Sequence, residues 1–236
     1  MKNAKINKKI IKLWDKYFKD YPNEHGPLFY DDFTPGGIVF VGINPSSSPS
    51  GQKTILKDTE YADIKQEEFF LWKNLSKSPK DIAICIEFEK LSFQKYSYFK
   101  IMHKIAAELK IPCAHLDIFL YKLTSQEKFK DKIIENGKLN QFAIEQLEIF
   151  DEVLTDTKPK IVVIANAYGS ELINNYYKNR LRFDSKNGWH FFTLSNGKEV
   201  PIFFSSMISG QRSLDIWSRN RLVWHINNAL LTQRNI

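Results

Sequence analysis

Cysteine is scarce in this sequence, which holds Cys85 and Cys113 and no others in 236 residues. They stand in neither a CxxC pair nor a zinc-ligand spacing, and an iron–sulfur cluster requires more cysteine ligands than they supply. Conventional nucleotide-phosphate motifs are missing as well. We therefore expect buried thiols rather than a disulfide, and neither a metal nor a cofactor.

Long hydrophobic runs are also absent. Lys2, Lys5, Lys8 and Lys9 are not followed by the apolar stretch of a signal peptide, and no segment reaches the length of a membrane span. Hydrophobic residues make up 43% and charged residues 26% of the chain, a balance typical of soluble globular proteins. We expect a cytoplasmic protein with no membrane partner, folded as a single domain over residues 1–236.

Acidic residues are too few to balance the basic ones, so the formal net charge is +7 and the isoelectric point is near 9.2. A basic surface favours polyanionic partners, because each Lys or Arg set against a phosphate releases condensed counterions. The charge is compatible with DNA as the partner, either single- or double-stranded. A solvated lysine face on the N-terminal helix would explain much of the same excess without any partner.

The spacing of apolar residues predicts the elements of the fold. Helical periodicity predicts helices over residues 7–21, 66–75, 93–109, 139–157 and 168–177, and a C-terminal helix with Ser213 as its candidate N-cap. Short apolar runs predict strands over residues 37–42, 112–119, 159–165, 189–194 and 200–205. Residues 79–91 fit neither pattern. This alternation is typical of an α/β fold, and we expect a three-layer α/β/α sandwich around a mainly parallel, four-stranded sheet.

Loops that follow parallel strands are the first place to look for a site, because ligands bind beyond the carboxyl ends of such strands. The loops after Val41, Phe119 and Phe204 are therefore expected to form one crevice. The first begins with Gly42-Ile43-Asn44-Pro45 and continues as a serine-rich stretch as far as Gly51. Because this stretch leaves the end of a buried strand, we interpret it as a site loop rather than a linker.

The motif Gly42-Ile43-Asn44-Pro45 resembles the first catalytic motif of the mismatch-specific and thymine-DNA glycosylase branch of the uracil-DNA glycosylase superfamily. Residues 158–165 resemble that superfamily's late central strand, and residues 205–212 occupy the place of its second motif. Relatives begin the second motif with His or Asn, whereas Ser206 is the best match here and Ser205 the next. The resemblance implies the superfamily's fold and a DNA-repair glycosylase that flips a base out of DNA.

The resemblance also implies roles for the first motif. Cleavage of a base from deoxyribose passes through an oxocarbenium-like sugar, and needs a placed water and stabilisation of the leaving base. Asn44 would aim the water, Ser206 would stand in for the second catalytic residue, and Ile43, Pro45 and Ser46 would bind the base. In the plainer alternative, the motif is a strand-to-loop turn in which Asn44 makes local side-chain bonds and Pro45 fixes φ.

Two further residues are candidates for recognising the base. Asp117 falls where the family has an Asn that reads uracil, but an ionised carboxylate only accepts hydrogen bonds and suits an exocyclic amine better. A structural bond from Asp117 to backbone amides is the alternative. Phe70 is the candidate stacking surface, although aromatic residues at helical spacing also fill cores.

A phosphate grip is predicted after the last strand. Ser209, Gly210 and Arg212 lie beside the expected N-terminus of the C-terminal helix, where anions are favoured. The alternative is a simple turn, with Arg212 paired to an acid such as Asp215.

Three functions are therefore open. The first is hydrolysis of the N-glycosidic bond of uracil or a related base in DNA. The second is a non-catalytic module that binds nucleic acid or a nucleotide on the same fold. The third is a nucleoside hydrolase. A Ser-His-Asp hydrolase is set aside because the sequence has no GxSxG motif.

Overall fold

The computed structural model describes residues 3–21, 23–46, 49–210 and 213–234. The chain divides into two compact units. The first unit consists of Met1–Asp32, Asn44–Tyr96 and Phe119–Phe150, and the second of Phe33–Ile43, Ser97–Ile118 and Asp151–Ile236. Both units therefore draw on segments that are distant in the sequence. A single domain over residues 1–236 stays a prediction.

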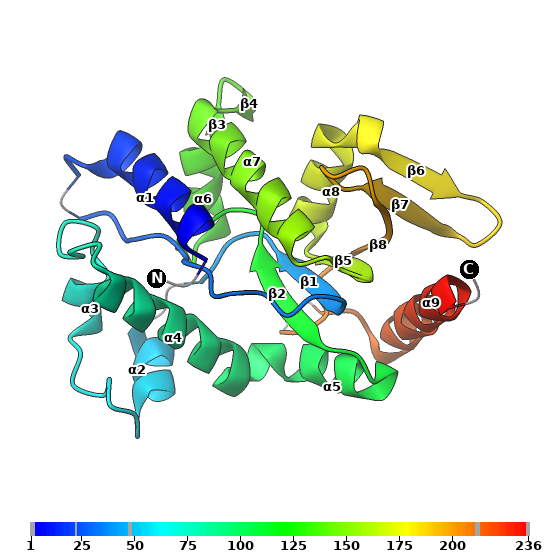
Figure 1. The fold of residues 1–236 in the computed structure, drawn as a ribbon, viewed down its shortest axis with the longest axis horizontal. Helices are drawn as coiled ribbons and strands as arrows, with labels where there is room; N and C mark the ends of the chain where they lie inside the picture. The colour runs from blue at the N-terminus through cyan, green and yellow to red at the C-terminus, as the bar shows by residue number, and fades with distance from the viewer. Residues whose placement is uncertain (1–2, 22, 47–48, 211–212, 235–236) are drawn as a thin grey trace. The chain divides into compact units, whose positions relative to one another are not determined.

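A six-stranded sheet belongs to the second unit (Figure 1). Its strands, in spatial order, are β2 (Cys113–Asp117), β1 (Ile38–Gly42), β5 (Ile161–Ala165), β8 (Glu199–Ser205), β7 (Trp189–Thr193) and β6 (Leu181–Asp184). The first four are mutually parallel, and β7 and β6 continue the sheet as antiparallel strands. Every residue of β1 and β5 is buried, as expected for central strands covered on both faces.

The α/β class and the mainly parallel sheet are confirmed, but the predicted number of four strands is wrong because the sheet has six. The β7–β8 hairpin around Asn196-Gly197 adds one antiparallel strand, and β6 adds the other. Within β6, Arg182 and Phe183 are exposed, so this short edge strand lacks the apolar pattern that marks the central strands.

Helices cover both faces of this sheet. On one face, α5 (Lys100–Leu109) and α9 (Ile216–Arg234) contribute Ile105 and Ile226 to a buried cluster that includes Val163 of β5. On the other face lies α8 (Ala167–Tyr176), where Gly169 packs close to Ile164. Because Val163 and Ile164 are neighbours in a strand, their side chains point to opposite faces. The second unit alone thus has a helix–sheet–helix layering.

Most remaining helices belong to the first unit. They are α1 (Ala4–Phe18), α2 (Pro49–Leu56), α3 (Gln66–Phe69), α4 (Pro79–Lys95) and α6 (Gln126–Ile133), with a small hairpin of β3 (Ile134–Glu135) and β4 (Lys138–Leu139). Helix α7 (Gln141–Asp156) contributes residues to both units, and short 3-10 turns, η1 (Ser97–Phe99) and η2 (Lys178–Arg180), belong to the second. Among the described residues, no helix is both long enough and apolar enough to cross a membrane.

Several predicted helix boundaries are wrong. Helix α4 fills the region left unassigned, and Ser78 caps it by accepting a hydrogen bond from the Asp81 amide. Helix α3 ends at Phe69 instead of continuing to residue 75. The serine-rich loop is shorter than expected, because α2 begins at Pro49.

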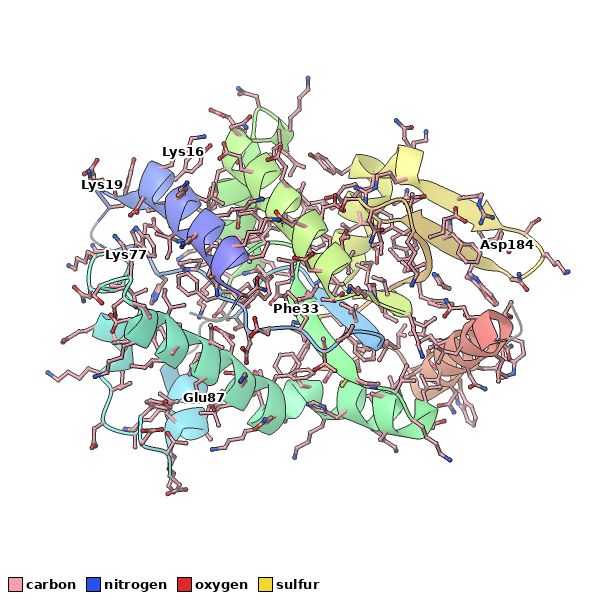
Figure 2. All side chains as sticks on the ribbon, viewed as in Figure 1. Lys16, Lys19, Phe33, Lys77, Glu87 and Asp184 are labelled. Carbon is pink, nitrogen blue, oxygen red and sulfur yellow. The ribbon has the colours of Figure 1, made fainter. Side chains whose placement is uncertain are left out.

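Helix α1 has one buried side, so its lysines face solvent from the other. Its buried side includes Trp14 and Phe18, whose rings lie 5.4 Å and 5.0 Å from that of Phe142. Lys16 on its exposed side and Lys19 just after its end are labelled in Figure 2, and Lys16 contacts Glu145 at 2.5 Å. This arrangement matches the plainer interpretation of the N-terminal charge as a solvated helix face.

Candidate functional site

The carboxyl ends of the parallel strands bring a row of residues to one edge of the sheet in the second unit. Gly42 pairs in register with Asp117, and Ala165 pairs with Ser205. Between β1 and β5 the register pairs Val41 with Ile164, so Gly42 and Ala165 are the next residues at this end of the two strands. Two small residues therefore separate two polar ones across the four strands, in the order Asp117, Gly42, Ala165, Ser205.

The Asp117 carboxylate lies very close to Gly42 at this edge of the sheet. Its side chain is 4% exposed, and its Oδ1 atom lies 3.4 Å from Nε2 of His115. A Cβ atom added to Gly42 would lie 2.3 Å from the same Oδ1, which is far inside contact distance. The glycine of the first motif is therefore required by the Asp117 carboxylate that fills the space above it. The partner of Asp117 is a histidine, whereas the structural alternative predicted backbone amides.

Ser205 and Ser206 differ in their surroundings. The Ser205 hydroxyl is buried and has no hydrogen-bond partner among the described residues, while its carbonyl accepts a bond from the Ser170 hydroxyl at 3.0 Å. Ser206 follows the end of β8 and is partly buried. Asp117 and Ser205 stand three strand spacings apart, roughly 14 Å, so these polar ends of the row do not contact each other.

The loop after β8 is built as a turn. Ile208 is 1% exposed and anchors it, and Gly210 has a φ of 90°, in the region that favours glycine. The Gly210 carbonyl accepts a bond from the Ser213 amide at 3.3 Å, and Ser209 is partly buried. These contacts match the plainer interpretation of the segment as a turn. Arg212 lies outside the described residues.

The predicted N-cap of the C-terminal helix is wrong by two residues. Helix α9 begins at Ile216, and Asp215 caps it by accepting bonds from the amides of Trp217 and Ser218 at 2.9 Å and 3.0 Å. The bond from the Ser218 hydroxyl to Asp215 lowers the pKa of that carboxyl. The Asp215 carboxylate therefore caps the N-terminus of α9, a position at which aspartate is common.

Asn44 lies in the first unit, where its side-chain amide is fixed in orientation. Its Nδ2 atom donates to the carbonyls of Leu123 at 2.7 Å, Tyr121 at 3.2 Å and Pro45 at 3.3 Å. Carbonyl oxygens only accept hydrogen bonds, so the nitrogen must face them and Oδ1 must point away from them. Among the described residues no hydrogen bond to Oδ1 is present. One half of this side chain is therefore structural, and the other half remains able to bind a water.

Pro45 and Ser46, which follow Asn44, also contact the segment around Leu123. The Pro45 carbonyl accepts a bond from the Leu123 amide at 3.0 Å, and the hydroxyls of Ser46 and Thr124 lie 3.2 Å apart. Pro45 is buried and Ser46 is exposed. Ile43, which belongs to the second unit, is 6% exposed and so offers its backbone rather than its side chain.

Lys122 lies between Tyr121 and Leu123, whose backbone carbonyls accept hydrogen bonds from the Asn44 amide. It is 5% exposed, and its ammonium forms an ion pair with the Glu89 carboxylate. The same ammonium lies 5.2 Å from the ring centre of Phe70 and 5.5 Å from that of Phe88. Burial of the imidazole lowers the pKa of His25, and the positive charge of Lys122 lowers it further. A buried cation thus anchors the segment that orients Asn44.

Phe70 is enclosed rather than open to a ligand. Its ring is 3% exposed and packs 5.0 Å from the ring of Phe88, in addition to the contact with Lys122. A stacking role would require this ring to be uncovered. The packing agrees with the alternative that aromatic residues at helical spacing fill the core.

Sequence reasoning missed several residues near these positions. His115 was overlooked, although its spacing of two residues from Asp117 in a strand predicts that both side chains share one face. Lys122, Glu89 and Thr124 carried no recognisable signal. In the part of the chain that the structure describes, no group of three or more His, Cys, Asp or Glu side chains could hold a metal ion.

The Lys122–Glu89 pair predicts an asymmetry between two substitutions. Glu89→Gln leaves a buried ammonium unpaired and should lower the free energy of unfolding by about 3 kcal/mol. Lys122→Met keeps the aliphatic stem and leaves the partly exposed Glu89 to be hydrated, so it should cost less. Urea denaturation measures both. Equal losses, or a change below about 0.5 kcal/mol for Glu89→Gln, would contradict the assignment.

Gly42→Ala should lower the free energy of unfolding by about 1–3 kcal/mol, because its methyl group overlaps the Asp117 carboxylate. In the Gly42→Ala/Asp117→Ala double variant the overlap is removed, so the two effects should be less than additive. Thermal unfolding compares both with Asp117→Ala alone. Gly169→Ala is the matched control, because the nearest atom that its added Cβ would meet is the end of the Ile118 side chain, at 3.1 Å. Strict additivity would contradict the prediction.

Comparison with known proteins adds no assignment. No protein-family model matches the sequence, and no curated protein matches it either. The resemblance in the Gly42-Ile43-Asn44-Pro45 motif therefore stays a prediction about function.

Proposed function

We propose that this protein is a DNA glycosylase-like enzyme that extrudes a damaged or deaminated base and hydrolyses its N-glycosidic bond. The observation that carries the proposal is the fixed amide of Asn44, whose nitrogen is bound to three backbone carbonyls while its oxygen is directed away from them. A carboxamide oxygen held in this way can orient a water by accepting a hydrogen bond from it.

Asn44 does not need to act as a base in this reaction. The C1′ carbon of the sugar becomes electrophilic as the bond to the base lengthens, and the water attacks it with little need for prior deprotonation. One proton of the water is lost to solvent as the C–O bond forms, and the electron pair of the broken C–N bond leaves with the base. Positioning of the water is therefore the contribution assigned to Asn44.

The resemblance to the glycosylase superfamily assigns recognition of the leaving base to Asp117 and to the segment that begins at Ser206. Asp117 accepts hydrogen bonds when ionised, so it favours a base that carries an exocyclic amine. Ser206 and the backbone around Ser209 and Gly210 would donate to the departing base or to a phosphate. The basic composition of the chain supports DNA as the substrate, and we expect no metal or cofactor.

A second candidate, a non-catalytic module that binds nucleic acid, is favoured by one specific observation. All three hydrogen bonds of the Asn44 amide are to backbone carbonyls, so a structural role would be enough to explain this residue. Ser206, in place of the family's His or Asn, points in the same direction. Such a module would bind DNA without producing an abasic site.

Asn44→Ala tests the proposal. The purified protein should release a base from single- or double-stranded oligonucleotides carrying uracil, mismatched thymine, hypoxanthine, xanthine or a modified cytosine, as revealed by alkaline cleavage. The variant should be slower by about 100-fold, within the range for loss of one positioned polar group. Asn74→Ala is the control, because its exposed amide also donates to a backbone carbonyl. Intact oligonucleotides with the native protein, or equal rates with Asn44→Ala, would exclude this chemistry. Free nucleosides assayed in parallel identify a nucleoside hydrolase.

Asp117→Asn should change base preference rather than abolish cleavage. An amide can donate to the O4 carbonyl of uracil, which an ionised carboxylate cannot. The ratio of kcat/KM for uracil to that for a modified cytosine should therefore rise, by about tenfold for one exchanged hydrogen bond. An unchanged ratio would remove Asp117 from base recognition, whatever its effect on stability.

A further inference from the structure

The outer face of α9 exposes a stripe of large side chains. Trp217, Trp224 and Leu231 are 72%, 61% and 46% exposed. They are spaced seven residues apart, close to two helical turns, so they follow one side of the helix. The opposite side of α9 is buried against the sheet through Ile226 and Leu230. Large apolar side chains aligned and exposed on one side of a helix are typical of an interaction surface.

Figure 1 shows the positions of α5 and α9. Residues of both helices line a groove beside this stripe, with a volume of about 380 Å³. Ile101 and Ile105 of α5 and Val223 of α9 give it apolar walls. Trp224 borders the groove as well, so the groove and the stripe share a residue. Both elements belong to the second unit, and their shared core packing fixes the groove.

The polar residues of the groove are mostly donors. Lys104 and Arg219 carry positive charge and form no ion pair with a described residue, and Asn220 and Asn227 add two amides. Glu108 is the one acid among the lining residues, and residues 216–234 contain neither Asp nor Glu. Pairing of α9 with the same helix of a second copy would bring like charges together. The charge therefore favours a polyanion.

We propose that the α5–α9 groove and the Trp217–Trp224 stripe bind a single strand of nucleic acid. Stacking on exposed aromatic rings beside a basic groove is how proteins hold single strands without reading their sequence. Bases would stack on Trp217 and Trp224, phosphates would contact Arg219 and Lys104, and the asparagine amides would bond to base edges. A duplex offers no free base faces along its length and should bind less tightly.

This binding surface is separate from the glycosylase proposal. It includes no residue assigned to water positioning or base recognition, and a strand bound here needs no damaged base. An anionic membrane surface is the main competitor, because Trp, Leu and Arg also occur on helices that lie on lipid. The hollow beside Trp224, with Asn220 and Asn227 between the apolar residues, fits a strand better than a face that enters a bilayer.

The other tryptophans make the test unusually direct. Trp14, Trp72 and Trp189 are 0%, 1% and 4% exposed. Quenching of tryptophan fluorescence by a ligand that stays in solution should therefore report on Trp217 and Trp224. Because both are exposed, their replacement should leave the fold intact, which circular dichroism checks.

The test titrates an oligothymidylate without damaged bases into the full chain, following tryptophan quenching and the anisotropy of a fluorescein label. Trp217→Ala and Trp224→Ala should each raise Kd by about tenfold, and the double variant by about 100-fold with loss of quenching. Arg219→Gln should reduce the slope of log K against log salt by about 1. Phe183→Ala is the matched control, because Phe183 of β6 is 58% exposed yet lies on another element. Its Kd should not change.

Two results would overturn the proposal. One is an unchanged Kd and full quenching in the double tryptophan variant. The other is no response to oligothymidylate together with a fluorescence shift on vesicles of phosphatidylserine and phosphatidylcholine, which would assign the stripe to membranes. Base release and oligothymidylate binding are measured separately, so failure of the glycosylase proposal and failure of this one give different results.

Discussion

The parallel pairing of β1 between β2 and β5 is the constraint on which the rest of the second unit depends. It places the ends of strands from distant parts of the sequence at one edge, and it decides which side chains stand in a row there. A slip of one residue would turn β1 over, and its buried side chains would then pack on the wrong faces of the sheet. The positions of Gly42 and Asp117 follow from that register, not from any property of the loop.

The first unit contains a buried positive charge, the ammonium of Lys122. Burying the Lys122 ammonium is unfavourable unless its charge is compensated, and the Glu89 carboxylate and the faces of Phe70 and Phe88 supply that compensation. The backbone of Tyr121–Leu123 is consequently held from one side by this anchor and bonded to the Asn44 amide on another. Phe70 therefore has a structural role, because its ring packs against the Lys122 ammonium. This role does not depend on the binding of a base.

The elements that sequence alone could predict are those whose reasons are local. Strands β1 and β5 are continuous apolar runs, and α1 ends before Pro22, so both kinds were recognisable. Helix α4 had a local signal too, in the Ser78 cap followed by Pro79. Its buried Ile82, Cys85 and Ile86 have helical spacing, whereas buried Phe88 departs from it. The extent of α3 could not be predicted, because Leu71 instead pairs with His25, far away in the chain. The same holds for the site: the His115–Asp117 spacing was visible, whereas Lys122 and Glu89 lie 33 residues apart and meet only in the folded chain.

The contact between Gly42 and Asp117 has an evolutionary consequence. A lineage with glycine at position 42 is free to change residue 117, because loss of the carboxylate only leaves space. A lineage that first acquires a side chain at position 42 fills space beside the carboxylate, so a return to Asp117 carries the cost of that overlap until the glycine is restored. The order of substitutions therefore changes their cost, and among descendants of this protein an aspartate at position 117 should be found mainly with a glycine at position 42.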